Sequence, residues 1–153
     1  FFALPWSLYF SIAFVIAFTV LPSLILPQLQ INNGPEGLID LGRFSHIYLI
    51  YHFHLSRKFS LKVKPFLDDE FHGLFATRAP SRPNAIGLSI VELIGTEKNI
   101  LRVKNIDVLD GTPLLDIKPY VPGFDIRKVN KIGWMEKKIK NLDEAEDDGR
   151  FAE

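Results

Sequence analysis

Apolar and polar residues alternate along much of this chain with the period of two that is typical of β-strands. The clearest example is Ser45–Leu55 (SHIYLIYHFHL), which is rich in aromatic and β-branched residues. In a strand, alternate side chains point to opposite faces of the sheet. The pattern therefore predicts a strand here with Ile47, Leu49, Tyr51 and Phe53 on one face and the intervening residues on the other.

Further short strands follow at regular spacing, with Gly and Pro at their junctions. The pattern predicts strands at 61–66, 73–77, 86–94, 100–106 and 114–117. It also predicts a hairpin turn over Gly95–Asn99 and one or two helical turns at Trp134–Ile139. Such spacing is typical of an antiparallel barrel or sandwich. We therefore expect an all-β protein, mainly an antiparallel β-barrel, with a few short helical turns and an extended C-terminal tail.

The N-terminal stretch Trp6–Leu26 contains no charged residue and includes one internal proline. A membrane-spanning helix needs about 20 apolar residues, and this stretch is long enough. The absence of flanking Lys or Arg argues against membrane insertion, and its many β-branched and aromatic residues also suit buried strands. The alternatives are a membrane tether, a buried strand pair, and a stretch whose sequence has been misassigned.

Charge is distributed unevenly over the 153 residues. We expect an uncharged apolar segment at 1–35, a barrel domain at 36–142 and an acidic tail at 143–153. The barrel region carries seventeen Lys and Arg against twelve Asp and Glu. A basic body suits a polyanionic partner such as RNA, although solvated surface charge accounts for the same counts. The absence of cysteine excludes disulfides and thiolate chemistry, and it fits a reducing, cytoplasmic setting.

A proline-bracketed loop carries two arginines. Arg78 and Arg82 flank Pro80, and proline restricts the backbone on both sides of it. A restricted loop loses less entropy on binding, and guanidinium is the preferred fork for carboxylate or phosphate. The loop is therefore a candidate ligand-binding element. The alternative is that one arginine pairs with Asp110 or Asp116 to hold two loops together.

A second polar segment surrounds the sequence Asp110-Gly111, which predicts a tight turn because Asp accepts backbone hydrogen bonds and Gly supplies positive φ. The simple interpretation is a hairpin corner. The alternative adds Asp107, Asp116 and Lys118, which would form the polar wall of a pocket.

Three histidines, His46, His52 and His54, share strand parity and could ligate a metal. No carboxylate lies at matching parity nearby, so we expect exposed or hydrogen-bonded histidines and no metal site. Gly87, which follows the arginine loop, predicts close backbone approach or a bulge.

Several stretches together resemble the TsaA-like family, also called the YaeB-like family. The resemblance covers about residues 38–151. It rests on Phe44–His46 (FSH), Phe53–His54 (FH), Gly73–Ser89 (GLFATRAPSRPNAIGLS), Asp107–Tyr120 (DVLDGTPLLDIKPY), Ile132–Trp134 (IGW) and Asp148–Phe151 (DGRF).

The resemblance implies a β-barrel methyltransferase that is usually a homodimer. Such an enzyme uses S-adenosylmethionine to methylate the exocyclic N6 of threonylcarbamoyladenosine, the purine just 3′ of the tRNA anticodon. S-adenosylmethionine, tRNA and a second copy of the chain are thus the expected cofactor and partners. The alternative is a non-catalytic module of the same fold that binds the donor or RNA, possibly tethered to a membrane.

The resemblance also implies roles for individual residues. The methyl donor would contact Phe53, His54, Arg78, Leu88, Asn105, Ile106, Asp107 and Val108. Pocket building or substrate binding would fall to Arg82, Asn84, Asp110, Lys118 and Tyr120. As the catalytic groups that accept the amine proton or hold the amino group, we expect Asp107 and Asp116.

The start of the chain departs from the family. The family opens with a strand near a PIG.I.SPY pattern, followed by a Pro-Arg-Gln loop that also touches the donor. Residues 1–35 show neither feature. The resemblance therefore assigns no residue to that wall of the donor site.

Overall fold

The computed structural model describes residues 14–17, 28–31 and 35–139. The chain folds into two compact units that alternate along the sequence. The first comprises Phe1–Phe53 and Gly87–Val121, and the second comprises His54–Ile86 and Pro122–Glu153. Each unit has its own buried core.

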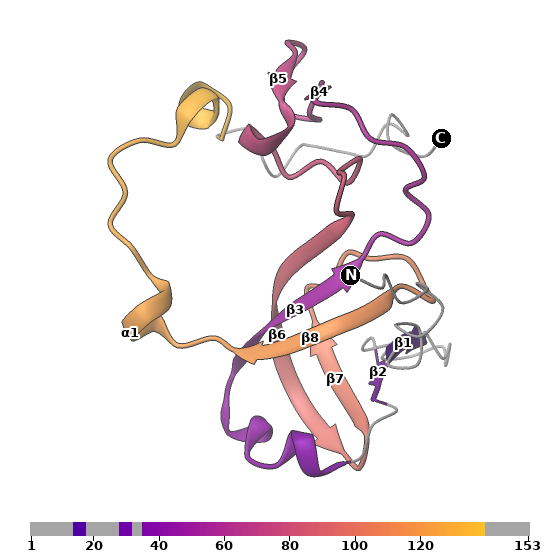
Figure 1. Cartoon of the computed structure of the whole chain (residues 1–153). Helices are drawn as coiled ribbons and strands as arrows, with labels where there is room; N and C mark the ends of the chain where they lie inside the picture. The colour runs from indigo at the N-terminus through magenta and orange to yellow at the C-terminus, as the bar shows by residue number, and fades with distance from the viewer. Residues whose placement is uncertain (1–13, 18–27, 32–34, 140–153) are drawn as a thin grey trace, which may run out of the picture. The chain divides into compact units, whose positions relative to one another are not determined.

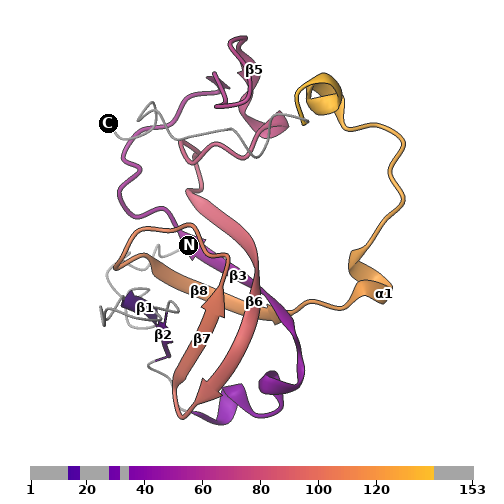
Figure 2. The ribbon, with the colours of Figure 1, turned by 180° about the vertical axis from the view of Figure 1, so that it is seen from behind.

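The first unit is built on a barrel with the strand order β1-β2-β7-β6-β3-β8. Because β1 also pairs with β8, the sheet returns to its starting strand (Figures 1 and 2). The strands are β1 (Phe14–Ala17), β2 (Gln28–Gln30), β3 (His46–His52), β6 (Ile86–Glu97), β7 (Ile100–Lys104) and β8 (Pro113–Pro119). Two short 3-10 turns, η2 (Pro35–Leu38) and η3 (Leu41–Arg43), precede β3. The expected all-β, mainly antiparallel fold with few short helices is confirmed.

The barrel core follows the predicted alternation. On β3, Ile47, Leu49 and Tyr51 are buried, and the residues between them are only half-buried. Phe53, predicted for the same face, lies past the end of β3 and packs against the rim of the core. The remaining buried members come from other strands of the barrel and include Leu29, Val91, Leu93, Leu101, Val103 and Leu114.

The β6–β7 hairpin differs from the prediction. β6 continues through Gly95 to Glu97, and the turn is the two-residue step Lys98–Asn99. A register shift between Leu93 and Gly95 marks a β-bulge, which absorbs an extra residue and lets the ladder continue. Lys98 adopts a left-handed φ of 54°, a conformation that tight hairpin turns require.

The second unit is loop-rich around a small core of Val63, Leu74 and Ala79. Its elements are β4 (Lys62–Val63), β5 (His72–Gly73), η4 (Leu74–Ala76), α1 (Pro122–Asp125) and η5 (Gly133–Lys137). The strand predicted over 73–77 is therefore wrong beyond Gly73. The chain turns instead because the Leu74 carbonyl accepts hydrogen bonds from both the Thr77 N–H (3.0 Å) and the Thr77 hydroxyl (2.8 Å).

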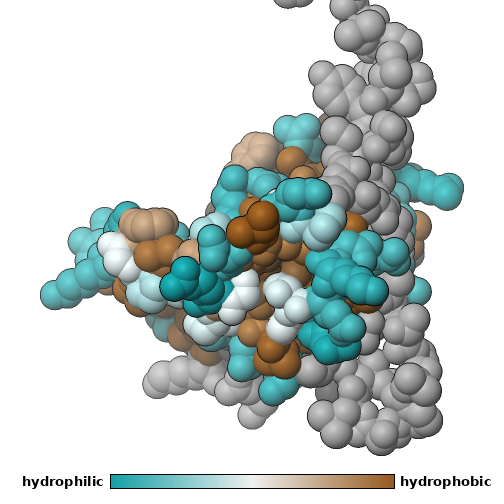
Figure 3. Space-filling view, turned by 90° about the horizontal axis from the view of Figure 1, so that it is seen from below, coloured by the Kyte–Doolittle hydropathy of each residue, from teal (hydrophilic) through white to brown (hydrophobic). Residues whose placement is uncertain are grey.

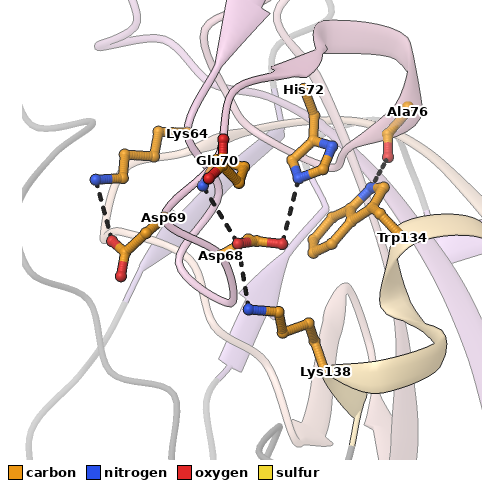
Figure 4. Close-up of polar contacts among 8 residues, drawn as sticks. All are labelled: Lys64, Asp68, Asp69, Glu70, His72, Ala76, Trp134 and Lys138. Atoms are coloured by element: carbon orange, nitrogen blue, oxygen red, sulfur yellow. Dashed lines mark hydrogen bonds and ion pairs between the residues drawn. The ribbon is translucent and has the colours of Figure 1, made fainter.

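A polar and aromatic cluster attaches η5 to the β4–β5 region of this unit (Figure 4). The Trp134 ring stacks on His72 with ring centroids 4.4 Å apart. Asp68, whose side chain is only 9% exposed, lies 3.3 Å from Lys138 Nζ and 3.5 Å from His72 Nε2. Its Oδ1 also accepts the Glu70 N–H at 3.2 Å. These contacts join segments of the second unit that are far apart in sequence.

Acid is expected to weaken this attachment. Partial burial acts to raise the pKa of Asp68, but hydrogen bonds from Glu70, Lys138 and Asp69 outweigh it and lower the pKa below 3.8. Because folding depresses this pKa, the contribution of Asp68 to stability is complete above pH 3.8 and is lost as pH falls through the folded-state value. Urea titrations of wild type and Asp68→Asn, followed by Trp134 fluorescence in a Trp6→Phe background, should differ at neutral pH and converge at the acid end. A difference that stays constant with pH would contradict this assignment.

Some sequence predictions fall outside the described residues. These are the acidic tail at 143–153 and all of Trp6–Leu26 except Phe14–Ala17, which forms β1. In the part of the chain that the structure describes, no helix is long and apolar enough to cross a membrane.

Candidate functional site

One rim of the barrel gathers most of the candidate residues of the first unit. We call it the corner rim and define it by Phe53, Leu88, Asn105–Val108 and Asp110. The pairing register brings these positions to one end. Tyr51 at the end of β3 pairs with Leu114 at the start of β8, and its hydroxyl lies 3.0 Å from Ser89 Oγ near the start of β6. Lys104, the last residue of β7, pairs with Glu92 in the middle of β6, and because the two strands are antiparallel, the chain leaves β7 in the direction of Leu88.

Apolar side chains form the base of the corner rim. Phe53, Ile106 and Val108 are partly buried and pack against the barrel core. Phe53 sets its ring at 85° to that of Tyr51, with centroids 5.4 Å apart. Leu88 is 53% exposed and lies on the face of β6 opposite to the buried Val91 and Leu93.

Because Gly87 has no side chain, the Tyr51 ring can lie directly against its backbone and still contact the Phe53 ring. A Cβ atom at Gly87 would lie 2.1 Å from Cε2 of Tyr51, far inside contact distance. The predicted close approach at Gly87 is therefore confirmed, and its partner is the Tyr51 ring. Because Tyr51 in turn contacts Phe53, Gly87 affects the position of a candidate binding residue.

Asn105 adopts an unusual backbone conformation at the rim. Its φ is 61°, in the left-handed region that residues other than glycine rarely adopt, although Asn is among those that tolerate it best. Strained residues of this kind cluster at binding sites. Here the conformation turns the chain sharply at the end of β7.

We expect Asn105→Ala to destabilise the protein by about 1 kcal/mol, because alanine tolerates the left-handed region less well than asparagine. Asn105→Gly should be neutral within about 0.5 kcal/mol or slightly stabilising. Thermal unfolding of both variants measures the difference. Equal stability of the two variants would show that the backbone is free to relax at this position.

The Asp110-Gly111 turn forms as predicted. The Leu109 carbonyl accepts the Thr112 N–H at 3.2 Å and the Thr112 hydroxyl at 2.7 Å. Asp110 Oδ1 accepts the Gly111 N–H at 2.9 Å, and Gly111 has a φ of 78°. The turn is not a hairpin corner, because it connects β7 to β8 and these strands are not neighbours in the barrel. Asp107, just before it, is exposed.

Other candidates lie away from this rim. Tyr120 donates its backbone N–H to the His46 carbonyl at 3.1 Å, and its ring lies 5.6 Å from that of Tyr48. β8 runs antiparallel to β3, so Tyr120 lies at the end of β3 opposite Phe53.

Asp116 and Lys118 are on β8 between the two ends. Asp116 Oδ2 pairs with Lys118 Nζ at 2.7 Å, and its Oδ1 accepts the Ile117 N–H at 2.8 Å. The Asp–Lys pair is therefore formed, but with both side chains about half exposed. The structure thus separates the two expected catalytic carboxylates: Asp107 belongs to the corner rim, whereas Asp116 lies farther along β8 with a lysine partner.

A half-open cavity of about 370 Å³ lies at the end of the barrel opposite the corner rim. Residues of η2, η3 and β8 line it, among them Leu38, Leu41, Phe44, Asp116, Ile117 and Pro119. Figure 3 shows apolar surface between hydrophilic side chains in a view from below. The sequence did not predict this cavity, because part of its lining, Gly37–Leu41, belongs to no motif and only the fold brings it beside Asp116 and Ile117 of β8.

The remaining candidates belong to the second unit: His54, Arg78, Arg82 and Asn84. Arg82 is bound within its own loop, where Nη1 donates to the carbonyls of Thr77 (3.1 Å) and Ala79 (3.2 Å). Its guanidinium carbon also lies 5.7 Å from the centre of the Phe75 ring. Arg78 and Asn84 are exposed.

The histidine pattern leads to no metal cluster among the described residues, which contain no group of three or more possible ligands. His46 Nδ1 instead lies 3.0 Å from the hydroxyl of Ser45.

The family assignment follows from comparison with known proteins. The model of the tRNA-methyltransferase O N-terminal domain family matches residues 24–126. The chain belongs to this family. The resemblance to TsaA-like proteins is thereby confirmed.

Relatives of the family share both sequence and fold with the chain. A probable S-adenosyl-L-methionine-binding protein from Pyrococcus abyssi is 59% identical over 116 residues, covering 76% of the chain and 63% of the relative. A mouse tRNA (adenine(37)-N6)-methyltransferase is 40% identical over 97 residues, covering 61% of the chain and 22% of the relative. The chain thus spans less than two thirds of the length of these relatives.

Solved structures support the fold directly. A crystal structure of TrmO superposes with a TM-score of 0.62 at 36% identity, covering 80% of the chain and 62% of the other protein. The structure of TrmO from Pseudomonas aeruginosa gives a TM-score of 0.61 at 33% identity, with 80% and 60% covered. The fold of the chain is therefore that of the tRNA-methyltransferase O family.

Proposed function

We propose that this chain is an S-adenosylmethionine-dependent methyltransferase acting on N6 of threonylcarbamoyladenosine beside the tRNA anticodon. Family membership supports the reaction class. Relatives from mouse and human are named tRNA (adenine(37)-N6)-methyltransferases, and others are named for binding S-adenosyl-L-methionine. The proposal includes a homodimer in the cytoplasm.

The convergence of Phe53, Leu88 and Asn105–Val108 at the corner rim is the observation that carries the proposal. The residues there fit the chemistry of the donor. Phe53 and Leu88 offer apolar surface to a purine, and the exposed carboxylate of Asp107 suits polar hydrogen atoms of the donor or of the acceptor amine. The roles of His54 and Arg78 in donor binding are proposed from the family resemblance alone, and guanidinium is the preferred partner of a carboxylate such as that of the donor.

The reaction is an in-line displacement in which the methyl carbon leaves sulfur and bonds to N6, while the N6 proton passes to a base. Alignment of two reactants can contribute about 7–11 kcal/mol to lowering the barrier. We assign the base to Asp107, because Asp116 already pairs with Lys118 at 2.7 Å. Asp110 of the corner rim is proposed for substrate binding, and Arg82 and Asn84 are proposed for it from the family resemblance. Lys118 and Tyr120 are left out because, within the first unit, they lie away from the corner rim.

The proposal is tested by incubating the protein with methyl-labelled S-adenosylmethionine and two tRNA pools, one carrying the threonylcarbamoyl group and one lacking it. Nucleoside mass spectrometry should locate the label on threonylcarbamoyladenosine in the first pool only. Label on another nucleoside would redirect the substrate assignment, and absence of label despite donor binding would contradict catalysis.

A non-catalytic module of the same fold is the second candidate, because the relative with 59% identity is named for donor binding alone. Calorimetric titration with S-adenosylmethionine, combined with the labelling experiment, distinguishes the non-catalytic module from the enzyme. Binding that Arg78→Ala weakens, without methyl transfer, would favour the module. Transfer to tRNA would exclude it.

A further inference from the structure

Phe75 presents an aromatic ring to solvent from an otherwise anchored segment. Among the described residues, no large apolar side chain is more exposed than Phe75, at 77%. Single exposed apolar residues are common on protein surfaces. This one differs because the residues on both sides of it are fixed.

The backbone around Phe75 is held by contacts from three directions. Leu74 is buried, and its N–H donates to the Leu61 carbonyl at 3.0 Å. The Ala76 carbonyl accepts a hydrogen bond from Trp134 Nε1 at 2.9 Å (Figure 4). The Thr77 hydroxyl donates to the Leu74 carbonyl at 2.8 Å. A ring on such a segment is presented in a preformed position, which lowers the entropy lost on binding.

Arg82 lies over this ring. Its guanidinium carbon is 5.7 Å from the ring centre, within cation–π range, and Nη1 is fixed by the carbonyls of Thr77 and Ala79. Arginine therefore covers part of Phe75 while most of the ring stays in solvent. Aromatic rings and guanidinium planes are the surfaces on which unpaired nucleic-acid bases stack.

The charge of the second unit suits a nucleic acid. Its described residues include eleven Lys and Arg against five Asp and Glu, whereas those of the first unit include five against seven. Basic residues attract the phosphate backbone without regard to sequence. A basic unit with an exposed, fixed aromatic ring combines the two features of single-strand binding surfaces.

We propose that Phe75, with Arg82, is a stacking platform for an unpaired base of the RNA substrate. This inference rests on the proposed function, which makes a tRNA anticodon loop the substrate. Bases of a loop can be splayed out onto a protein ring, whereas those of a duplex are already stacked on their neighbours.

Fluorescence anisotropy with a labelled anticodon stem-loop RNA tests the platform. Phe75→Ala should weaken binding about 5- to 100-fold, and Phe75→Trp should bind within about threefold of wild type. Phe124→Ala, which removes another exposed phenylalanine of the same unit, is the matched control and should change binding less than about twofold. A fully paired RNA duplex of equal length should bind Phe75→Ala and wild type alike.

Either of two results in the binding assay would overturn the platform: unchanged loop binding by Phe75→Ala, or an equal loss on the duplex. The methyl-transfer assay separates this inference from the proposed function. If wild type methylates tRNA and Phe75→Ala does so with the same KM, the platform is wrong and the function stands. If neither protein methylates tRNA but loop binding depends on Phe75, the function is wrong and the platform stands.

Discussion

Gly87→Ala is expected to destabilise the barrel by about 3 kcal/mol or more, at or above the upper end of typical overpacking costs. A Cβ at this position would lie 2.1 Å from Cε2 and 2.5 Å from Cζ of Tyr51. Tyr51 is only 5% exposed, and its hydroxyl contacts Ser89, so it has little room to move. Urea denaturation gives the free energy of unfolding directly.

Gly95→Ala is the matched control, because Gly95 lies on the same strand and an added Cβ would meet nothing within 4 Å. Its stability should stay within about 0.5 kcal/mol of wild type or rise slightly. The double variant Tyr51→Ala/Gly87→Ala should be more stable than the sum of the single effects predicts, by about 1–3 kcal/mol. Strict additivity would mean that Gly87 acts through something other than the Tyr51 ring.

The same clash connects stability to function. Moving Tyr51 would also move Phe53, whose ring lies 5.4 Å from it. We therefore expect any folded fraction of Gly87→Ala to bind S-adenosylmethionine more weakly than Gly95→Ala does. Calorimetric titration of both variants under native conditions provides that comparison.

Local patterns in the sequence were sufficient to predict β3, β6, β7 and β8, whereas they left a strand at β1 as one of three alternatives and predicted none at β2. Alternation on β3 grouped Ile47 and Leu49 on one face, which the structure buries, because the faces of a strand depend only on residue parity. It failed at Gly95 and after Gly73. In the first case a bulge carries the strand past a glycine, and in the second a threonine hydroxyl binds a carbonyl three residues earlier. Thr96 and Glu97 after the bulge are exposed, and the Thr77 bond involves a backbone carbonyl, so neither feature leaves an apolar alternation in the sequence.

The sequence predicted which motifs carry the candidate site residues, but not which of those residues lie close together in the fold. Asp107 and Tyr120 belong to one continuous motif, yet β8 carries the chain from one end of β3 to the other between them. A motif records which residues occur together in sequence, whereas a seven-residue strand spans about 23 Å, more than most ligand sites. Arg82 shows the same limit, because its two carbonyl partners are backbone groups that no residue pattern identifies.

Asp107→Asn is expected to lower kcat for methyl transfer by about 10²- to 10⁴-fold, the usual effect of removing a general base. Asparagine preserves the size and much of the hydrogen bonding of aspartate but cannot accept the N6 proton. Because the substitution is at an exposed position, the free energy of unfolding should change by less than about 0.5 kcal/mol. Single-turnover kinetics with saturating donor and tRNA measures the chemical step.

Asp116→Asn provides the contrast between the two carboxylates. Asp116 is paired with Lys118 on an exposed stretch of β8, so its loss should change kcat by less than about threefold. Donor affinity, measured separately, should be similar in both variants if Asp107 acts mainly on the proton. A large loss of kcat in Asp116→Asn with normal turnover by Asp107→Asn would reverse the assignment, and it would move the reacting amine from the corner rim toward the middle of β8.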